Sequence, residues 1–555
     1  MTEKKRILIV GGVAGGASCA ARARRLSEEA EIIVFERGPY VSFANCGLPY
    51  YVGDVITEEK DLMVATPGLF KKRFNIDIRV ESDVIAIDRD KNEIEVKDIK
   101  TGQVYRERYD ALLLSPGASP IRPPLPGIDI SGILTLRTIP DSRQIREWVS
   151  ERNATSAVVV GGGFIGLEMT ENIVKRGLSV TIIEMQSQVM PSLDPEMVTP
   201  IHNTLTVHGV SLCLSDGVLG FEENDDGTIS VNTKSGKKYI TDIVILAIGV
   251  RPEVGLARDA GLKIGELGGI RVNDQMRTSD EGIWAVGDAC EVRDFITKKW
   301  SLVPLAGSAN RQGRIAADTI LGRDLRFRGV QGTAVCSVFD LTFASTGVSE
   351  KTLSRAINSG RAVNYEKIYL HPGHHVGYYP GAKPISLKLI FSTEDGKILG
   401  AQAVGEQGVE KRIDIISMAI QQNSTVFDLE EAELCYAPKF GAAKDPVNIA
   451  GMIAANVLRG DAPVVHWENI EKTKAMILDV RNVSEFKEGH MKGAINIPLT
   501  ELRGRMDELP PDREIWVYCA VGQRSYYATR TLRQNGFNAK NLSGGFKLYK
   551  MMFDV

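Results

Sequence analysis

Residues 7–16 read ILIVGGVAGG, and residues 157–166 repeat the pattern as AVVVGGGFIG. In each stretch an aliphatic, β-branched run typical of a buried strand leads into a glycine-rich turn, and a helical pattern follows. Each unit ends in a second apolar strand closed by an acid, Glu36 in the first unit and Glu184 in the second. This is the order of a βαβ dinucleotide-binding unit, so the sequence predicts two such sites on one chain.

The second unit is predicted to be inserted in the first. The chain returns to a strand and turn at 111–117 (ALLLSPG), and a similar stretch at 243–249 (IVILAIG) closes the second unit. After the second unit the pattern is one of strands followed by helices, with no further glycine-rich dinucleotide motif. A linker at 460–463 then leads into a last region in which strands and helices alternate. We therefore expect an α/β protein with four parts: Rossmann-like domains at 1–120 with 251–325 and at 121–250, an α+β domain at 326–459, and an α/β domain at 463–555.

The bulk composition indicates a globular protein of several domains. The chain has 555 residues, of which 43% are apolar and 25% charged. Its formal net charge of −3 favours neither nucleic acid nor an anionic membrane as a partner, and no apolar run approaches the roughly 20 residues of a membrane span. Seven thinly spread cysteines suit a reducing compartment. The charged start, residues 1–6, runs directly into the first strand, so we expect a cytoplasmic protein without a cleaved signal.

The glycines of the second unit favour NADH as its ligand. Gly161, Gly163 and Gly166 have the full spacing that lets a helix N-terminus meet a pyrophosphate, and Glu184 lies where it can accept hydrogen bonds from a ribose. An acid at that place repels a 2′-phosphate, and Met185 and Gln186 supply no compensating arginine, so NADPH is less favoured. The predicted NADH contacts are Gly161, Gly163, Phe164, Ile165, Gly166, Glu184 and Gly249.

The first unit departs from the spacing, because Val13 stands at the middle glycine position, but a second signature accompanies it. Residues 278–288, TSDEGIWAVGD, are similar to the second flavin motif of the flavoproteins with two dinucleotide-binding domains, in which the final aspartate, here Asp288, binds the ribityl chain of FAD. The resemblance extends from Lys5 to about Arg459. It implies FAD contacts at Gly11, Gly12, Val13, Ala14, Gly15, Gly16, Glu36, Arg37, Asp288 and Ala289.

One cysteine follows the first ribose acid closely enough to reach a flavin. It lies in residues 42–50, SFANCGLPY, as Cys46. Dithiol reductases of the resembled superfamily carry a second cysteine five residues later, where this chain has Tyr51. Cys46 therefore has no partner in its own loop, and it must exchange with an external thiol or cycle through a sulfenic acid.

These two options correspond to two families. The peroxide- and oxygen-reducing members place a histidine in the first glycine loop, where this chain has Ala14. The chain resembles instead the coenzyme A disulfide reductases, which share the Ser-Phe-x-Asn-Cys motif and use a tyrosine near the end of the reductase part, matched here by Tyr436. That family pattern implies a homodimer with shared sites, a dimerisation domain at 326–459, and coenzyme A contacts at Ser18, Arg22, Arg25, Ser42, Asn45 and Lys444.

The last 90 or so residues resemble a rhodanese domain in the order and spacing of their motifs. The decisive stretch is 517–525, VYCAVGQRS, in which a strand leads to Cys519 and a loop. Backbone N–H groups of such a loop can stabilise a thiolate or persulfide. From Cys519 to Arg524 the loop has the six residues used by sulfurtransferases, and we expect Cys519, Gly522 and Arg524 to form the sulfur site.

Together these features predict an NADH- and FAD-dependent reductase of small sulfur compounds: coenzyme A disulfide, coenzyme A persulfide or polysulfide. Cys46, Tyr436 and Cys519 are the predicted catalytic residues, and coenzyme A is a bound thiol or cosubstrate. No metal site is expected, because the histidines at 371–375 lack further apparent ligands. Two alternatives stay open: an NADH oxidase or peroxidase with a Cys46 sulfenic acid, and a persulfide carrier or redox sensor without turnover.

Overall fold

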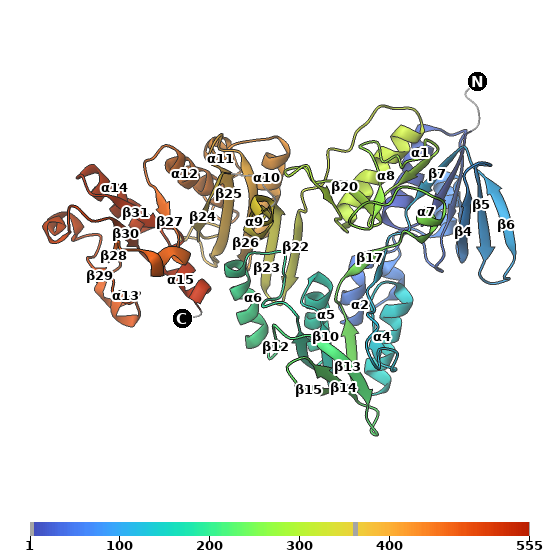
Figure 1. The fold of residues 1–555 in the computed structure, drawn as a ribbon, viewed down its shortest axis with the longest axis horizontal. Helices are drawn as coiled ribbons and strands as arrows, with labels where there is room; N and C mark the ends of the chain where they lie inside the picture. The colour runs from blue at the N-terminus through green and yellow to red at the C-terminus, as the bar shows by residue number, and fades with distance from the viewer. Residues whose placement is uncertain (1–4, 359–363, 554–555) are drawn as a thin grey trace. The chain divides into compact units, whose positions relative to one another are not determined.

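A computed structural model describes residues 5–358 and 364–553, and the side chains of all these residues except 356–358. The chain divides into two compact units (Figure 1). The first contains Met1–Val189 and Gly209–Gly332, and the second contains Met190–His208 and Thr333–Val555. Residues 190–208 fall in the sequence range expected for the inserted nucleotide domain, but they group with the second unit.

The first sheet of the first unit is parallel, with strand order β19-β7-β1-β2-β3. Its strands are β1 (Arg6–Val10), β2 (Glu31–Phe35), β3 (Asp77–Arg79), β7 (Ala111–Leu114) and β19 (Ile283–Ala285). Their aliphatic side chains are almost all buried, as expected for strands covered on both faces. Because β19 follows the inserted domain yet pairs with β7, the predicted insertion of one dinucleotide fold in the other is confirmed.

The inserted domain repeats this plan in a second parallel sheet of order β12-β11-β10-β16-β9. Its strands are β9 (Ile133–Leu134), β10 (Ser156–Val160), β11 (Ser179–Ile183), β12 (Ser211–Cys213) and β16 (Ile243–Leu246). In both domains a helix follows the glycine turn: α1 (Ala14–Leu26) in the first and α5 (Phe164–Lys175) in the second.

The glycine turns have the same geometry in the two domains. Gly11 and Gly161 have φ angles of 89° and 106°, a region that favours glycine. A Cβ atom at Gly16 would collide with the carbonyl oxygen of Gly11, and one at Gly166 with that of Gly161. The glycines therefore allow each helix to start directly against the strand that precedes it.

Smaller elements complete the first unit. The two three-stranded antiparallel sheets are β4 (Ser82–Asp88), β5 (Glu93–Asp98) and β6 (Val104–Arg108), and β13 (Val218–Glu223), β14 (Ile229–Thr233) and β15 (Lys238–Thr241). The other strands are β8 (Ala118–Pro120), β17 (Val250–Pro252), β18 (Ile270–Arg271), β20 (Cys290–Arg293) and β21 (Trp300–Ser301). The other helices are η1 (Asn45–Gly47), α2 (Leu48–Val52), η2 (Glu59–Leu62), α3 (Pro67–Phe74), α4 (Ile139–Glu151), α7 (Gly255–Asp259) and α8 (Ala306–Ile320).

The second unit holds an antiparallel sheet of order β22-β23-β26-β25-β24. The strands are β22 (Ala334–Val338), β23 (Leu341–Gly347), β24 (Tyr365–Leu370), β25 (Ile385–Ser392) and β26 (Ile398–Gly405). The helices around it are α6 (Pro195–Val207), α9 (Glu350–Asn358), α10 (Val409–Gln421), α11 (Val426–Glu431) and α12 (Pro446–Leu458). This is the predicted α+β domain.

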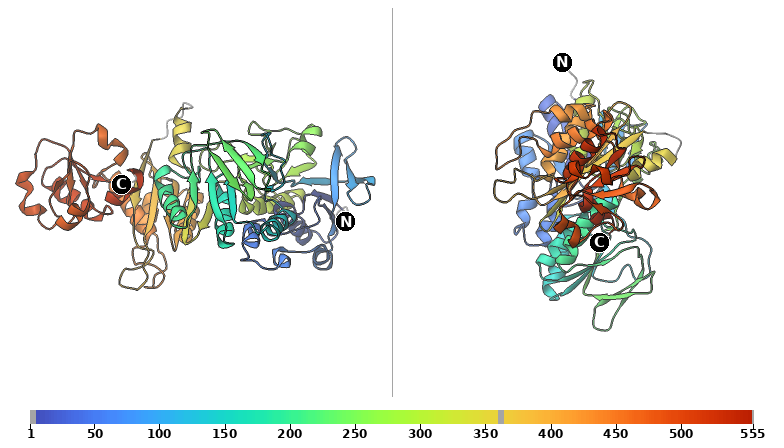
Figure 2. Two further views of the ribbon diagram at one scale, coloured as in Figure 1. Left: turned by 90° about the horizontal axis from the view of Figure 1, so that it is seen from below. Right: turned by 90° about the vertical axis from the view of Figure 1, so that its left-hand side faces the viewer.

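The C-terminal part is a parallel α/β domain of strand order β27-β31-β30-β28-β29. The strands are β27 (Val464–Val465), β28 (Met476–Asp479), β29 (Ile495–Asn496), β30 (Ile515–Tyr518) and β31 (Ala539–Leu542). The helices are η3 (Trp467–Lys472), α13 (Val483–Glu488), η4 (Leu502–Gly504), η5 (Met506–Glu508), α14 (Gln523–Gln534) and α15 (Gly545–Phe553). These elements can be followed by their orange-to-red colour in Figure 2.

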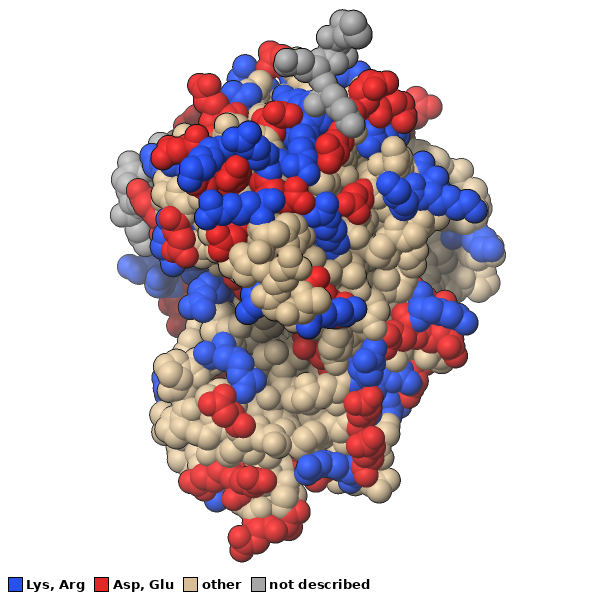
Figure 3. All heavy atoms as spheres, turned by 90° about the vertical axis from the view of Figure 1, so that its right-hand side faces the viewer, with Lys and Arg blue, Asp and Glu red and all other residues tan. Residues whose placement is uncertain are grey.

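Charged side chains of both signs are interspersed over the face drawn in Figure 3. Lysine with arginine and aspartate with glutamate number 67 and 70 in the whole chain, so neither sign dominates. Within the described residues no helix is both long and apolar enough to cross a membrane.

Candidate functional site

The first glycine turn forms a cradle that suits a dinucleotide. Glu36, at the end of β2, accepts hydrogen bonds from the backbone N–H groups of Gly12 (2.8 Å) and Gly38 (2.9 Å). These two bonds fix the carboxylate beside the start of α1, and each oxygen keeps a lone pair for a ribose hydroxyl. The turn thus brings together a helix N-terminus and an oriented acid, the two features that bind the adenosine half of a dinucleotide.

Asp288 lies close to the same turn. It follows β19, and a Cβ atom at Gly15 would lie 2.8 Å from the Val286 side chain, so the 286–288 segment packs against the turn. Among the described residues the Asp288 carboxyl has no hydrogen-bond partner. Burial raises its pKa, and Arg137 partly offsets that effect. A half-buried acceptor without a partner at this position fits a polyhydroxyl chain such as that of FAD.

The second glycine turn has the same arrangement. Glu184 accepts hydrogen bonds from the N–H groups of Gly162 and Gln186, both at 2.8 Å, which matches the two bonds of Glu36. A Cβ atom built on Gly163 meets nothing within 4 Å, so space is open in front of the turn. A pyrophosphate would fit this space at the N-terminus of α5. Phe164 and Ile165 form the first turn of α5, and Gly249, at φ 115°, follows β16.

Cys46 is exposed and lies in the 3₁₀ turn η1. Its loop is held against the first cradle, because the Ser42 N–H donates to the carbonyl oxygen of Gly12 (2.9 Å). Partial burial of the thiol raises the pKa of Cys46, as do the charges of Glu168 and Asp288. Beside it, the side-chain oxygen of Asn45 is buried and has no hydrogen-bond partner among the described residues, so it can accept a bond from a ligand.

The other residues assigned to coenzyme A have varied surroundings. Arg25 is exposed on α1, and Lys444 is exposed just before α12. Arg22 makes a two-pronged ion pair with Asp318 of α8, at 2.8 and 2.9 Å, and the Ser18 hydroxyl donates to Asn310 of the same helix. Arg22 therefore has a structural partner that the sequence did not reveal, and Arg25 is the freer of the two guanidinium groups.

Tyr436 has a neighbour, Tyr378, that was not among the predicted site residues. Its hydroxyl lies 2.6 Å from the hydroxyl of Tyr378, and this bond raises the pKa of Tyr436. Both rings are exposed, Tyr378 by 74% and Tyr436 by 45% of their surface, and Phe440 nearby is also exposed. The stretch Tyr378-Tyr379-Pro380-Gly381 suits the lining of a channel for the thiol, but nothing in it indicates that Tyr378 would meet Tyr436.

The C-terminal domain places Cys519 directly after β30. The thiol is fully buried, and its sulfur accepts hydrogen bonds from the Gly522 N–H (3.2 Å) and the Ser525 hydroxyl (3.4 Å). Gly522 has φ 99°, which turns its N–H toward the sulfur. Arg524 is held by two bonds to Glu485, at 2.6 and 2.7 Å. The loop is therefore a preformed cradle for a negatively charged sulfur.

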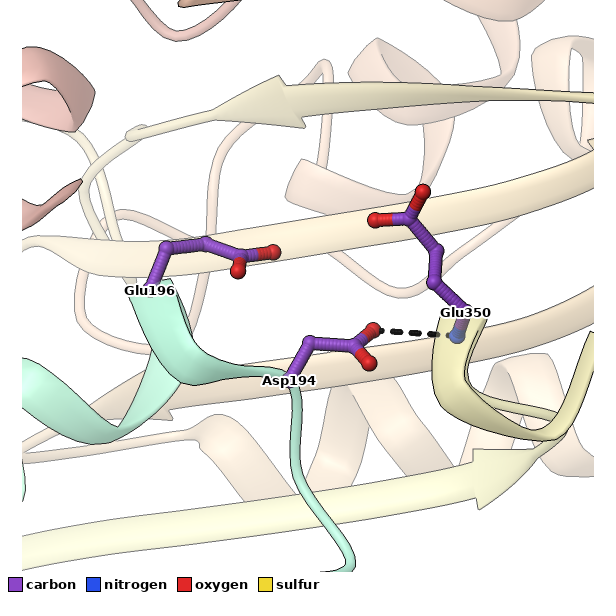
Figure 4. Close-up of side chains that lie close together, drawn as sticks. All are labelled: Asp194, Glu196 and Glu350. Atoms are coloured by element: carbon purple, nitrogen blue, oxygen red, sulfur yellow. Dashed lines mark hydrogen bonds between the residues drawn. The ribbon is translucent and has the colours of Figure 1, made fainter. Parts of the chain in front are cut away.

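Three acids in the second unit have their carboxyl groups gathered together (Figure 4): Asp194, Glu196 and Glu350. The ammonium group of Lys388, from β25, lies among them at 2.7, 2.6 and 2.5 Å, and its side chain is fully buried. The position that a metal ion would need is therefore filled by a lysine. The sequence did not predict this cluster.

The charges of the cluster shift the pKa values of Lys388 and Glu350 in the directions that keep both groups ionised. Burial alone would lower the pKa of Lys388, but the charges of Glu196, Asp194 and Glu350 outweigh it and raise the pKa. Burial opposes ionisation of Glu350, yet Lys388 and Lys367 lower its pKa to about 2. Lys367 also binds Glu468 of the C-terminal domain at 2.6 Å, so the cluster extends to the contact between that domain and the antiparallel sheet.

The fold and the site define an oxidoreductase with two dinucleotide folds, one exposed thiol at the first fold, and a fused sulfur-binding domain. The model of the family described as pyridine nucleotide-disulphide oxidoreductase matches residues 5–313, and that family's dimerisation domain matches 333–445. The chain belongs to this family, whose members use FAD and a pyridine nucleotide. A rhodanese-like domain matches residues 463–552, so the predicted architecture is confirmed.

Two solved structures are similar over nearly the whole chain. One is that of reduced Bacillus anthracis CoADR-RHD, with 48% identity and a TM-score of 0.96 over 99% of this chain and 98% of that chain. The other is a NAD-dependent persulfide reductase from A. fulgidus, with 38% identity and a TM-score of 0.90 over 98% and 100%.

Two curated relatives match about four-fifths of the chain. A coenzyme A disulfide reductase of Staphylococcus haemolyticus is 34% identical over 82% of this chain and 100% of its own length. An NADH oxidase of Methanocaldococcus jannaschii is 36% identical over 80% of this chain and 97% of its own length.

Proposed function

We propose that the protein uses NADH to reduce small sulfur compounds, coenzyme A disulfide or persulfide, through a mixed disulfide at Cys46. The observation that carries the proposal is the exposed thiol of Cys46 in a loop bonded to the first cradle, with Tyr51 in place of a second cysteine. A lone thiol at this place can complete a disulfide only with an external sulfur. The similar persulfide and coenzyme A disulfide reductases support this substrate class.

The sulfur chemistry of Cys46 balances for both substrates. With a disulfide, the thiolate forms a bond to one sulfur and the other leaves as a thiolate that takes a proton. With a persulfide, the inner sulfur is attacked and hydrogen sulfide leaves. Bound FAD would supply the two electrons from NADH that split the mixed disulfide into Cys46 thiolate and free thiol. Gly11 to Gly16, Glu36 and Asp288 would hold FAD, and Gly161 to Gly166 with Glu184 would hold NADH.

The remaining roles follow from the same sites. Tyr436, oriented by its bond to Tyr378, would donate a proton to the departing sulfur or position it. Asn45, Arg25 and Lys444 offer polar or cationic groups for coenzyme A. Cys519 would carry sulfane sulfur as a persulfide in its N–H cradle. We propose the domain boundaries that the sequence indicates, at 1–120 with 251–325, 121–250, 326–459 and 463–555, except that residues 190–208 group with the second unit.

A homodimer with composite sites is part of the proposal. Tyr378, Tyr436 and Phe440 expose aromatic surface of the kind enriched in protein interfaces, and we assign Tyr436 and Lys444 to the site built around Cys46 of the other subunit. Mixing a Cys46→Ser chain with a Tyr436→Phe chain tests this. Each mixed dimer then holds one doubly defective and one intact site, so activity should return to about a quarter of the wild-type value. No recovery above either parent, with exchange verified, contradicts shared sites.

Steady-state oxidation of NADH and of NADPH, measured with coenzyme A disulfide, coenzyme A persulfide, oxygen and hydrogen peroxide, tests the proposed function. We expect turnover with the sulfur substrates, and a preference for NADH because Glu184 repels a 2′-phosphate. Turnover only with oxygen or peroxide supports the oxidase reading. Rapid reduction of the flavin without turnover on any substrate supports a carrier or sensor. Turnover restricted to oxygen or peroxide, or flavin reduction without turnover, would each overturn the proposal.

A further inference from the structure

Arg412 is a buried arginine that none of the roles above uses. It lies in the first turn of α10, and both Arg412 and its partner Asp445 are only 1% exposed. Its Nε donates to Oδ1 of Asp445 (3.2 Å) and its Nη2 to Oδ2 (2.8 Å), while Nη1 donates to the carbonyl oxygen of Gly408 (3.1 Å). A buried ion pair often adds little net stability, so its presence here points to a geometric role.

The guanidinium also binds the loop that carries Tyr378. This loop, residues 371–384, connects β24 with β25 and is called the Tyr378 loop below. Nη2 of Arg412 donates to the carbonyl oxygen of His374 at 2.7 Å. The Tyr378 loop closes on itself at the same residue, because the His374 N–H donates to the carbonyl oxygen of Lys383 (2.8 Å) and the Lys383 N–H to Nδ1 of His374 (2.9 Å). Arg412 therefore holds this loop at its closed base.

Asp445 belongs to the loop that carries Tyr436. This loop, residues 432–445, connects α11 with α12 and is called the Tyr436 loop below. Asp445 is the N-cap of α12, and its side chain accepts a hydrogen bond from the Val447 N–H (3.1 Å). The same carboxylate thus caps a helix and binds Arg412. The end of the Tyr436 loop is fixed by the residue that also holds the Tyr378 loop.

The two loops contact each other at two further places. The Val376 N–H donates to the carbonyl oxygen of Gly441 (3.0 Å), and the hydroxyl groups of Tyr378 and Tyr436 meet at 2.6 Å. Both tyrosine rings are exposed, so little packing holds them in place. Their mutual position therefore depends on where the two loops are anchored, and Arg412 bonds to both loops at once.

This double anchoring requires a guanidinium group. Its planar fork presents two N–H groups to the Asp445 carboxylate, and Nη2 has a second hydrogen for the His374 carbonyl. The ammonium group of a lysine is a single point charge. It could keep the charge pair with Asp445, but it could not bind the carboxylate through two parallel bonds and the carbonyl as well. The change Arg412→Lys therefore separates the charge from the geometry.

We propose that Arg412 is a positioning residue of the sulfur-reduction site: it anchors the two loops so that the Tyr436 hydroxyl, oriented by Tyr378, is presented to the departing sulfur. Arg412 itself contacts no substrate in this role. Because Lys444 directly precedes Asp445, the same anchor fixes a cationic group that we assign to coenzyme A. The inference rests on the proposed function for the role of Tyr436.

Hydrogen–deuterium exchange of the full-length holoenzyme, followed by mass spectrometry, tests the anchoring without a sulfur substrate. In Arg412→Lys we expect the amides of 373–381 and 436–445 to exchange about tenfold faster, because the two loops open locally more often. Peptides from β25 and β26 should keep their wild-type exchange. The double variant Arg412→Gln/Asp445→Asn removes both buried charges and keeps a good N-cap residue for α12. It should show the same local increase, which covers the case that Arg412→Lys folds poorly.

The rate of coenzyme A disulfide reduction tests the consequence of the anchoring. We expect kcat to fall about tenfold or more in Arg412→Lys, since a small displacement of a catalytic group has effects of this size. In a Tyr436→Phe background, where the hydroxyl is already gone, Arg412→Lys should change kcat by less than about twofold. A merely structural role would lower kcat equally in both backgrounds. Flavin reduction by NADH without a sulfur substrate should keep its wild-type rate.

Arg459→Met is the matched control, because it removes a surface ion pair with Glu430 (2.7 Å) from the same domain. It should leave both the exchange of the two loops and kcat unchanged. Wild-type exchange of both loops in Arg412→Lys, or an equal loss of kcat in the two backgrounds, overturns the inference. Wild-type kcat in Tyr436→Phe alone also overturns it, because no hydroxyl then needs positioning. If no sulfur substrate turns over, the proposed function fails, and the exchange result alone decides whether Arg412 anchors the loops.

Discussion

Replacing Cys46 with serine should lower NADH-dependent reduction of every sulfur substrate by on the order of 10³-fold or more, while FAD stays bound. A serine hydroxyl is a weak nucleophile and cannot form a disulfide, so the step that captures the substrate is lost. The flavin contacts proposed at Glu36 and Asp288 are unchanged in this variant. Initial rates with coenzyme A disulfide and persulfide, together with the visible spectrum of the purified protein, measure both expectations.

Cys336→Ser is a suitable control, because Cys336 is buried in β22 of the second unit and has no proposed role in catalysis. It should retain wild-type rates. Substantial residual reduction by Cys46→Ser, with bound flavin confirmed, would show that sulfur is reduced without a mixed disulfide at this residue.

Replacing Lys388 with methionine should destabilise the protein by about 3–5 kcal/mol, because it leaves the buried carboxylates of Asp194 and Glu196 and the half-buried one of Glu350 without their shared cation. Lys397→Met is the matched control. That lysine pairs with Asp395 on the surface, and an exposed pair contributes at most about 1 kcal/mol. Urea unfolding at pH 7, followed by tryptophan fluorescence, compares the two variants with the wild type.

The difference in free energy of unfolding between the wild type and Lys388→Met should also depend on pH, which gives a second test of the ion cluster. Glu350 has a lowered pKa, so the stability that it contributes is present above its unfolded pKa of about 4.5 and is lost as the pH falls toward about 2. The difference in free energy of unfolding between the wild type and Lys388→Met should therefore become smaller as the pH falls from about 4.5 toward about 2. A gap of less than 1 kcal/mol at pH 7, or one that does not depend on pH, contradicts a central role for the ion cluster.

Much of the fold followed from local sequence patterns. The two glycine turns predicted two dinucleotide folds because only glycine allows the φ angles of Gly11 and Gly161 and the close contact of each helix with its strand. The insertion followed from the repeated strand-and-turn at 111–117 and 243–249. The glycine turns and the repeated strand-and-turn are both short stretches of neighbouring residues, so the local sequence pattern was sufficient to predict these parts of the fold.

The parts that escaped prediction depend on residues far apart in sequence. Lys388 meets acids almost 200 positions away, and Arg22 meets Asp318 on another helix. Tyr436 was predicted from its motif, but nothing in the sequence indicated that its hydroxyl would meet that of Tyr378. A single sequence holds no local signal for such pairings.

The central claim is that Cys46 reduces sulfur substrates independently of Cys519. Measuring the reduction of two substrates by the Cys46→Ser and Cys519→Ser variants tests this claim most directly. Cys519 lies in a cradle of its own on the rhodanese domain, so it should be required only where sulfane sulfur is transferred, as from thiosulfate. We predict that Cys46→Ser loses reduction of coenzyme A disulfide and of coenzyme A persulfide, whereas Cys519→Ser keeps both and loses sulfur transfer from thiosulfate. If Cys519→Ser also loses reduction of coenzyme A disulfide, every substrate must pass through Cys519, and the account of Cys46 as the independent reduction site is wrong.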